Sequence, residues 1–224
     1  MGIPERKERE KERKRSLMIK AAEELIQEKG LANLNMDEVA LRAEVSKGSL
    51  YQYFNTKTNL ILGICDKASS LFNEEVAKVL GKDLPGLQLV YLIGETFLKF
   101  VTEHPEYFRA MRFLDTLKEV NEVDGSGYFK SCVAHRHSTF TCTVRAIQIG
   151  MQDGSINSSY DAKELAVLIW STSHGLVSLV YQNQNNQNHD LLDQLDLDIH
   201  SLLKGYIKLI GCGIANDGSK NKYD

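Results

Sequence analysis

The sequence predicts an all-α protein of about nine helices, with a three-helix head at the N-terminus and a larger helical body. Only three prolines occur in 224 residues, which is fewer than the turns of an all-β fold usually require. Apolar residues recur at helical spacing in each long segment, and helix-starting and helix-stopping residues fall between the segments. No strand pattern and no internal repeat stand out.

The chain begins with a charged run and one amphipathic helix. Residues 1–15 are almost all charged, which indicates either a frayed helical extension or a disordered arm. From Leu17 to Ile26 the apolar residues form one stripe, and Gly30 is expected to end the helix. The run from Arg6 to Arg15 holds seven positive charges interspersed with glutamates, so it could either touch a polyanion or be a solvated extension.

Two short helices are expected next, in tight succession. Asn35 and Glu38 have the spacing of a capping box, which would start the first of them. Ser46 is a second expected N-cap, opening a helix over Lys47–Tyr53. Because only residues 43–45 separate the two, the pattern is typical of a helix-turn-helix.

The body is expected to consist of long helices. Thr56 would cap a connector helix from Lys57 to about Leu80, and further helices are expected over residues 87–103, 105–120, 128–152, 161–181 and 191–212. A Gln/Asn tract over residues 182–188 is expected to be a solvated linker, and residues 216–224 a disordered tail.

Composition argues against several functional classes. Four cysteines lie far apart in the sequence with no CxxC pair, so nothing indicates a disulfide framework or a structural zinc site; they are Cys65, Cys132, Cys142 and Cys212. A charged N-terminus and the lack of a long apolar run predict a cytoplasmic protein with no membrane partner. Cys132 and His135 would share a helix face, but two ligands are not a metal site, so we expect no metal. We also expect no cofactor and no enzymatic activity, since no catalytic constellation stands out.

The charge is unevenly distributed along the chain. Residues 1–60 carry 12 Lys/Arg and 10 Asp/Glu, whereas the remainder carries 15 and 20. A slightly basic head on an acidic body would turn the head toward a polyanion. Ordinary scatter of surface charge would explain so small a difference equally well.

The segment VSKGSLYQYF over residues 45–54 is the strongest functional pattern. Leu50 and Phe54 would share the buried face of a helix, leaving the other side chains free to face a DNA groove. Lysine bonds guanine, glutamine pairs with adenine, and a glycine lets the backbone come close. Tyrosine hydroxyls and a lysine suit phosphate oxygens. The alternative is a plain three-helix domain with exposed tyrosines.

These residues resemble the head signature of the TetR family of repressors. The matching segments are Ile19–Ile26, Gly30, Val39–Ala40, Val45–Phe54 and Lys57. The resemblance implies a homodimeric DNA-binding transcriptional regulator, a repressor released from a pseudo-palindromic operator by a small apolar or amphipathic inducer. It places Lys47, Gly48, Ser49 and Gln52 toward the bases, and Tyr51, Tyr53 and Lys57 on phosphates. It also divides the chain into an arm and DNA-binding head (1–57), an effector-binding and dimerisation body (58–215) and the tail (216–224).

Two positions depart from the family pattern. The family often has a phosphate-binding threonine where this chain has Met36, so that role is not carried over. The family usually has glycine in the turn where Glu44 stands. A left-handed backbone there would strain a glutamate by on the order of 1 kcal/mol, so either the turn avoids that conformation or the strain is tolerated.

Two further sites are expected in the body. The candidate effector pocket consists of aromatic and polar residues on long helices, namely Phe97, Phe100, Phe108, Met111, His135, Phe140, Trp170 and His174. The resemblance also implies a four-helix dimer interface built from the last two expected helices, residues 161–181 and 191–212, of each copy. The candidate interface residues on the first of them are Leu165, Leu168, Ile169, Leu176, Leu179 and Val180. Each of these residues could equally be ordinary core.

Two other functions remain open at this point. An all-α enzyme or small-molecule carrier could have N-terminal helices that only resemble a DNA-binding head. A DNA binder of this family could also act without any inducer, structurally or through a protein partner.

Overall fold

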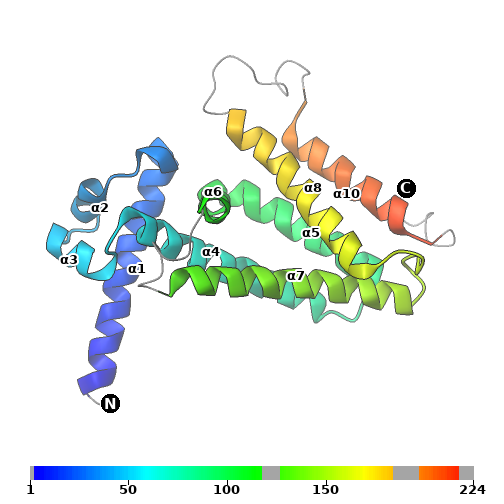
Figure 1. The fold of residues 1–224 in the computed structure, drawn as a ribbon, viewed down its shortest axis with the longest axis horizontal. Helices are drawn as coiled ribbons and strands as arrows, with labels where there is room; N and C mark the ends of the chain where they lie inside the picture. The colour runs from blue at the N-terminus through cyan, green and yellow to red at the C-terminus, as the bar shows by residue number, and fades with distance from the viewer. Residues whose placement is uncertain (1–2, 118–126, 184–196, 217–224) are drawn as a thin grey trace. The chain divides into compact units, whose positions relative to one another are not determined.

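A computed structural model describes residues 3–117, 127–183 and 197–216 (Figure 1). These ranges hold nine α-helices, two short 3₁₀ helices and no strand, with a single isolated bridge between Ile156 and Ala215. The prediction of an all-α fold is confirmed.

The helix bounds agree with most of the expected starts and stops. In chain order the helices are α1 (Ile3–Lys29), α2 (Met36–Arg42), α3 (Lys47–Tyr53), α4 (Lys57–Leu80), α5 (Gly86–Glu103), α6 (Pro105–Phe113), α7 (Tyr128–Gln152), α8 (Ala162–Asn183) and α10 (Ile199–Ile214). The expected extension of α6 to about residue 120 is wrong, because the chain tightens into a 3₁₀ turn at Leu114–Thr116. The start expected for the last helix, most of the Gln/Asn tract and nearly all of the expected tail lie outside the described residues.

The chain divides into two compact units. The first comprises Met1–Leu71 with His104–His135, and the second comprises Phe72–Glu103 with Arg136–Asp224. Helices α4 and α7 each begin in the first unit and continue into the second. The expected DNA-binding head, residues 1–57, is the part of the first unit that precedes and starts α4.

Helix α1 is buried along one face within the first unit. Met18, Ala22 and Ile26 of α1 are fully buried, as expected for one helix stripe. Lys67 of α4 pairs with Glu23 of α1, with Nζ 2.8 Å from Oε1. The charged N-terminal run is helical from Ile3 onward, so it extends α1 rather than forming an irregular arm.

The second unit packs α5 closely against α7 and α10. A Cβ added at Gly86 would lie 1.9 Å from the backbone nitrogen of Gly150, so α5 and α7 touch backbone to backbone. Asp153 Oδ2 accepts a hydrogen bond from Gly86 N at 2.7 Å, which caps the start of α5. Along α5, a Cβ at Gly94 would lie 3.3 Å from Ile207 of α10. Small residues at these crossings let the helices approach.

Candidate DNA-binding site and body cavity

The start of α2 is capped differently from the expectation. The Asn35 side chain accepts from Asp37 N at 2.8 Å, so the residue does act as the N-cap. Glu38 does not reach back to the cap. Its carboxylate pairs instead with Lys29 of α1 at 2.7 Å, because a full positive charge attracts it more strongly than a backbone amide does.

The turn between α2 and α3 adopts the left-handed conformation that the sequence puts in question. Glu44 has φ +55°, the one positive φ at a non-glycine residue in the described chain. Val45 N donates to Ala40 O at 2.9 Å, and Glu44 N donates to Leu41 O at 3.1 Å. These two bonds form a Schellman motif, which normally has glycine at the left-handed position. The strain at Glu44 is therefore present and tolerated.

Helix α3 is held by one buried face. The Ser46 side chain accepts from Ser49 N at 3.1 Å, which confirms the expected N-cap. Leu50 and Phe54 are fully buried. The Phe54 ring stacks on Tyr128 of α7, with ring centroids 6.1 Å apart. Gly63 of α4 makes room for it, since a Cβ there would lie 2.9 Å from the Phe54 ring.

The opposite face of α3 is open. Lys47, Gly48, Tyr51 and Gln52 are exposed, while Ser49, Tyr53 and Lys57 are half-buried. A Cβ added at Gly48 would meet nothing within 4 Å, so another molecule could approach the backbone there. All seven residues expected to contact DNA thus reach the surface around one short helix. Their roles remain predictions.

Sequence reasoning did not anticipate how far the cations of this region are already paired. Lys47 Nζ lies 2.6 Å from Asp37 Oδ2, and Lys57 Nζ donates to Ala32 O at 3.0 Å. Arg42 makes two bonds to Glu28, at 2.8 and 2.9 Å. No local sequence spacing signals these pairs, because each joins residues at least ten positions apart.

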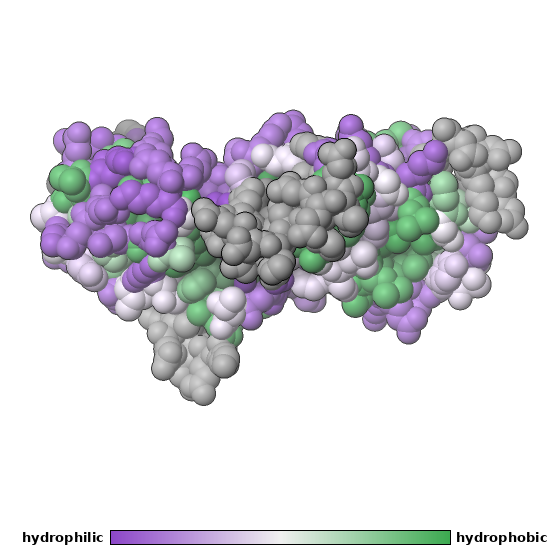
Figure 2. Space-filling model, turned by 90° about the horizontal axis from the view of Figure 1, so that it is seen from above, coloured by the Kyte–Doolittle hydropathy of each residue, from purple (hydrophilic) through white to green (hydrophobic). Residues whose placement is uncertain are grey.

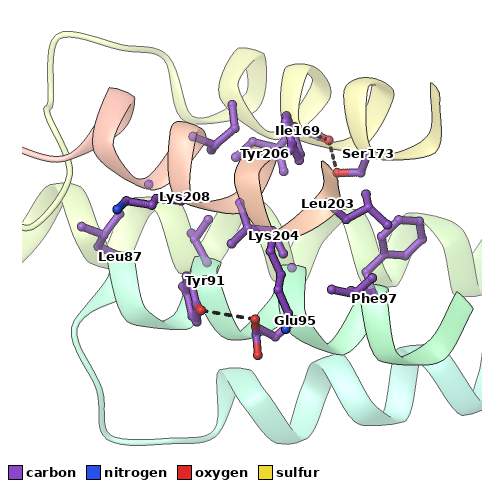
Figure 3. A pocket seen from close by; sticks show the side chains of 16 residues that line it. Leu87, Tyr91, Glu95, Phe97, Ile169, Ser173, Leu203, Lys204, Tyr206 and Lys208 are labelled. Atoms are coloured by element: carbon purple, nitrogen blue, oxygen red, sulfur yellow. Dashed lines mark hydrogen bonds between the residues drawn. The ribbon is translucent and has the colours of Figure 1, made fainter. Parts of the chain in front are cut away.

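The second unit contains a cavity of about 670 Å³ between α5, α8 and α10 (Figure 3). Its walls are largely apolar, with Leu87, Phe97 and Leu203 among them. Two lysines of α10, Lys204 and Lys208, also line it. This volume lies within the range of roughly 300–1,000 Å³ that is usual for small-molecule sites.

Polar groups inside the cavity are fixed in place. Tyr206 OH donates to Ile169 O at 3.1 Å, and Ser173 Oγ donates to the same carbonyl at 2.6 Å. Burial raises the pKa of the Tyr206 phenol, so this hydroxyl stays protonated as a donor. Tyr91 OH donates to Glu95 Oε1 at 3.2 Å on α5, as Figure 3 shows. The cavity thus combines apolar walls with a few oriented hydroxyls, two cations and the carboxylate of Glu95.

The residues expected to form the effector pocket are divided between the two units. Phe97, Phe100, Phe140, Trp170 and His174 belong to the second unit, and Phe108, Met111 and His135 to the first. His174 stacks on Phe97 with centroids 5.0 Å apart and lies 4.5 Å from the Trp170 ring. Of the eight, only Phe97 lines the cavity. The signal that sequence reasoning missed is in α10, where Lys204 and Lys208 lie one helical turn apart among apolar residues.

The outward face of α8 has no acidic or basic side chain beyond its first turn. Val167, Leu168 and Leu179 are 50%, 60% and 48% exposed. Ser171 and Thr172 lie on the same face, and their hydroxyls donate to the carbonyls of Val167 and Leu168. On neighbouring α10, Leu209 is 70% exposed. Figure 2, which looks onto the side where α8 and α10 lie in Figure 1, shows hydrophobic surface there.

Some residues expected at the dimer interface point elsewhere. Leu165 is buried within its own unit, and Ile169 lines the cavity. Leu176 is half-buried, and the side chain of Val180 lies outside the described set. The physical reason is that α8 has leucines on both its inner and its outer faces. Hydropathy alone therefore does not distinguish the face that packs inside the unit from the face that is exposed. Leu168 and Leu179 are exposed, and their place in a dimer interface stays a prediction.

Two family profiles match this chain. The profile of bacterial regulatory proteins of the tetR family matches residues 18–64, and that of the tetracyclin repressor-like C-terminal domain matches residues 90–202. The chain belongs to the TetR family. The resemblance seen in the head therefore extends to the body.

Relatives of this chain are distant in sequence. An uncharacterized HTH-type transcriptional regulator of Haemophilus influenzae is 27% identical over 103 residues, covering 46% of this chain and about half (50%) of the relative's own length. FadR from Bacillus subtilis, solved in complex with stearoyl-CoA, superposes with a TM-score of 0.67 at 16% identity, covering 89% of this chain and 98% of FadR. The TetR-family regulator PfmR from Thermus thermophilus gives 0.63 at 15%, covering 86% and 96%. These likenesses show a shared fold.

Two other findings concern the described part of the chain. It contains no helix with the length and apolar character needed to cross a bilayer. It also contains no group of three or more His, Cys, Asp or Glu side chains placed to hold a metal ion.

The strain at Glu44 gives a testable prediction. Glu44→Gly should raise the free energy of unfolding by about 0.5–1 kcal/mol, because glycine adopts the left-handed conformation without a Cβ clash. Urea unfolding followed by circular dichroism measures the change. Glu44→Ala is the matched control, since it removes the charge and keeps the Cβ. An equal gain in both variants would show that charge, and not backbone strain, is the cause.

Proposed function

We propose that the protein is a sequence-specific DNA-binding transcriptional regulator that reads DNA with α3. The observation that carries this proposal is the division of α3 into two faces. Leu50 and Phe54 fix one face in the core, while Lys47, Gly48 and Gln52 stand exposed on the other. A rigid helix with a short polar face and a glycine is what major-groove reading needs.

In this proposal, Lys47, Gly48, Ser49 and Gln52 face the bases and the groove floor. Tyr51, Tyr53 and Lys57 bond the phosphates on either side. Lys57 already bonds the Ala32 carbonyl, so it is held at the start of α4 rather than free to swing. Membership of a family of bacterial regulatory proteins supports the assignment.

The phosphate contacts can be tested by salt dependence. Replacing Tyr51 by Phe and Lys57 by Met should weaken binding to all DNA sequences. Losing the lysine contact should also flatten the slope of log K against log salt by about 0.9. Fluorescence anisotropy with duplex DNA at several salt concentrations measures both quantities. Replacing Lys82, an exposed lysine of the second unit, by Met serves as the control. An unchanged slope in the Lys57 variant would contradict its phosphate role.

We further propose that the outer face of α8, with Leu209 of α10, binds a second copy of the chain. This face has exposed leucines and no acidic or basic side chain from Val167 to Leu179, and its hydroxyls are satisfied within the helix. Burying it therefore removes apolar surface from water without stranding polar groups. A dimer would present two α3 helices to successive turns of a pseudo-palindromic operator.

The dimer face predicts the effect of one substitution. Leu168→Asp places a carboxylate on the face twice in each dimer, and should raise the dimer dissociation constant by on the order of 100-fold. Analytical ultracentrifugation over a range of concentrations measures it. Leu41→Asp, at a leucine of α2 that is 80% exposed, is the control and should leave assembly unchanged. A Leu168→Asp variant that remains dimeric at low micromolar concentration would exclude this face.

The cavity between α5, α8 and α10 is proposed as the effector site, and its ligand as an apolar molecule with an acidic group. The apolar walls would hold the hydrophobic part, and Lys204 and Lys208 would attract the acid. FadR from Bacillus subtilis, which shares the fold, was solved with stearoyl-CoA, and this supports a long acyl ligand.

A charge-removing variant tests this ligand class. Replacing both Lys204 and Lys208 by Met keeps their apolar stems and should weaken binding of long-chain fatty acids and their CoA thioesters by about tenfold, while leaving fatty alcohols unaffected. Isothermal titration calorimetry measures each. Lys163→Met, at an exposed lysine of α8 outside the cavity, is the control. Equal losses for acids and alcohols would contradict a charge-specific contact.

Repression with release by an inducer completes the proposal. A ligand can shift DNA affinity only if it binds the DNA-competent and DNA-incompetent states with different affinities. Helix α4 begins next to α3 and continues into the second unit, so it is the natural path for such coupling.

A further inference from the structure

Asp37 and Lys47 form an ion pair across the helix-turn-helix. Asp37 lies in the first turn of α2, and Lys47 is the first residue of α3. Lys47 Nζ and Asp37 Oδ2 are 2.6 Å apart, and the side chains are 64% and 53% exposed. An exposed pair of this kind contributes little to folding. Because Lys47 lies on the proposed reading helix, the pair can instead affect how the protein binds DNA.

The carboxylate of Asp37 competes with DNA for the same ammonium group. A lysine at the start of a recognition helix can bond a guanine edge or a phosphate, and either contact requires it to turn away from Asp37. The backbone of Asp37 is anchored, because its N–H donates to Asn35 Oδ1 at 2.8 Å. The Asp37 carboxylate therefore stays beside the exposed face of α3 when Lys47 turns away from that carboxylate.

Within the helix-turn-helix segment itself, the other charges do not offset this competition. From Met36 to Lys57 the chain has three cations and three carboxylates. Arg42 is held by Glu28 and Glu24, and Lys29 by Glu38. General attraction to phosphate is correspondingly weak in this segment.

We propose that Asp37 is a positioning residue that sets the selectivity of Lys47. On DNA of arbitrary sequence, Asp37 keeps the Lys47 ammonium paired and away from the phosphates. Lys47 leaves Asp37 only where a base edge binds the ammonium more strongly than the carboxylate does. A site that combines an attractive contact with a competing one discriminates by the difference between them. This inference rests on the proposed reading of DNA by α3.

The test compares Asp37→Asn with Glu38→Gln. Both variants remove one charge from the same turn of α2, and both break a short ion pair, but only Asp37 pairs with the reading helix. Two duplexes are used, one of mixed sequence and one selected by the wild-type protein from a random pool. Asp37→Asn should bind the mixed-sequence duplex about two- to fivefold more tightly, with a steeper salt slope, and should discriminate less well. Glu38→Gln should match the wild type.

A double-mutant cycle with Lys47→Met separates positioning from simple repulsion. If Asp37 acts through Lys47, Asp37→Asn should have no effect once Lys47 is replaced. The inference is overturned by an equal gain in Glu38→Gln, by a gain that persists without Lys47, or by no gain at all. A wild-type protein that enriches no sequence from the random pool and does not bind the mixed-sequence duplex would overturn the proposed function as well. Thermal unfolding of each variant confirms that the head stays folded.

Discussion

The burial of Phe54 is the contact on which the proposed DNA-binding site depends. Its ring stacks on Tyr128 of α7, and it fits because Gly63 of α4 has no side chain. With Leu50 one turn earlier, it fixes the seven-residue helix α3 to the much longer helices α4 and α7. A helix this short has little intrinsic stability, so it depends on this anchor to hold it against the core. The same anchor therefore determines the direction in which the exposed residues of α3 point.

In the turn before α3, the packing of the flanking helices outweighs the backbone preference of a single residue. The Schellman bonds at the end of α2 set the angle at which α3 begins, and they require a left-handed residue. The chain supplies Glu44 where glycine would be relaxed. The buried contacts on both sides of the turn determine its path, so they outweigh the strain of one residue. The same segment carries balanced charge, and its cations are engaged by carboxylates or carbonyls.

In the second unit, helix α8 has apolar surface on two opposite sides. The inner side of α8 closes a cavity with α5 and α10, and its outer side stays exposed. The serine and threonine hydroxyls on α8 bond the preceding turn, which leaves the outer face able to be buried without unsatisfied donors. Ligand binding and assembly would therefore use opposite sides of one helix. A change in its position could then affect both.

The sequence by itself determined the all-α class, most helix bounds, the caps at Ser46 and Thr56, and the residues that surround α3. These follow from periodicity and from side chains that bond their own neighbours, which are local properties. The tertiary structure alone decided the ion pair of Lys47 with Asp37, the partner of Glu38, and the left-handed turn at Glu44. It also decided which aromatic residues meet, and which leucines of α8 face inward. The side-chain contacts join residues of different helices, so they depend on how the helices pack. The turn at Glu44 is local, but the packing of α2 and α3 on either side of it imposes its conformation.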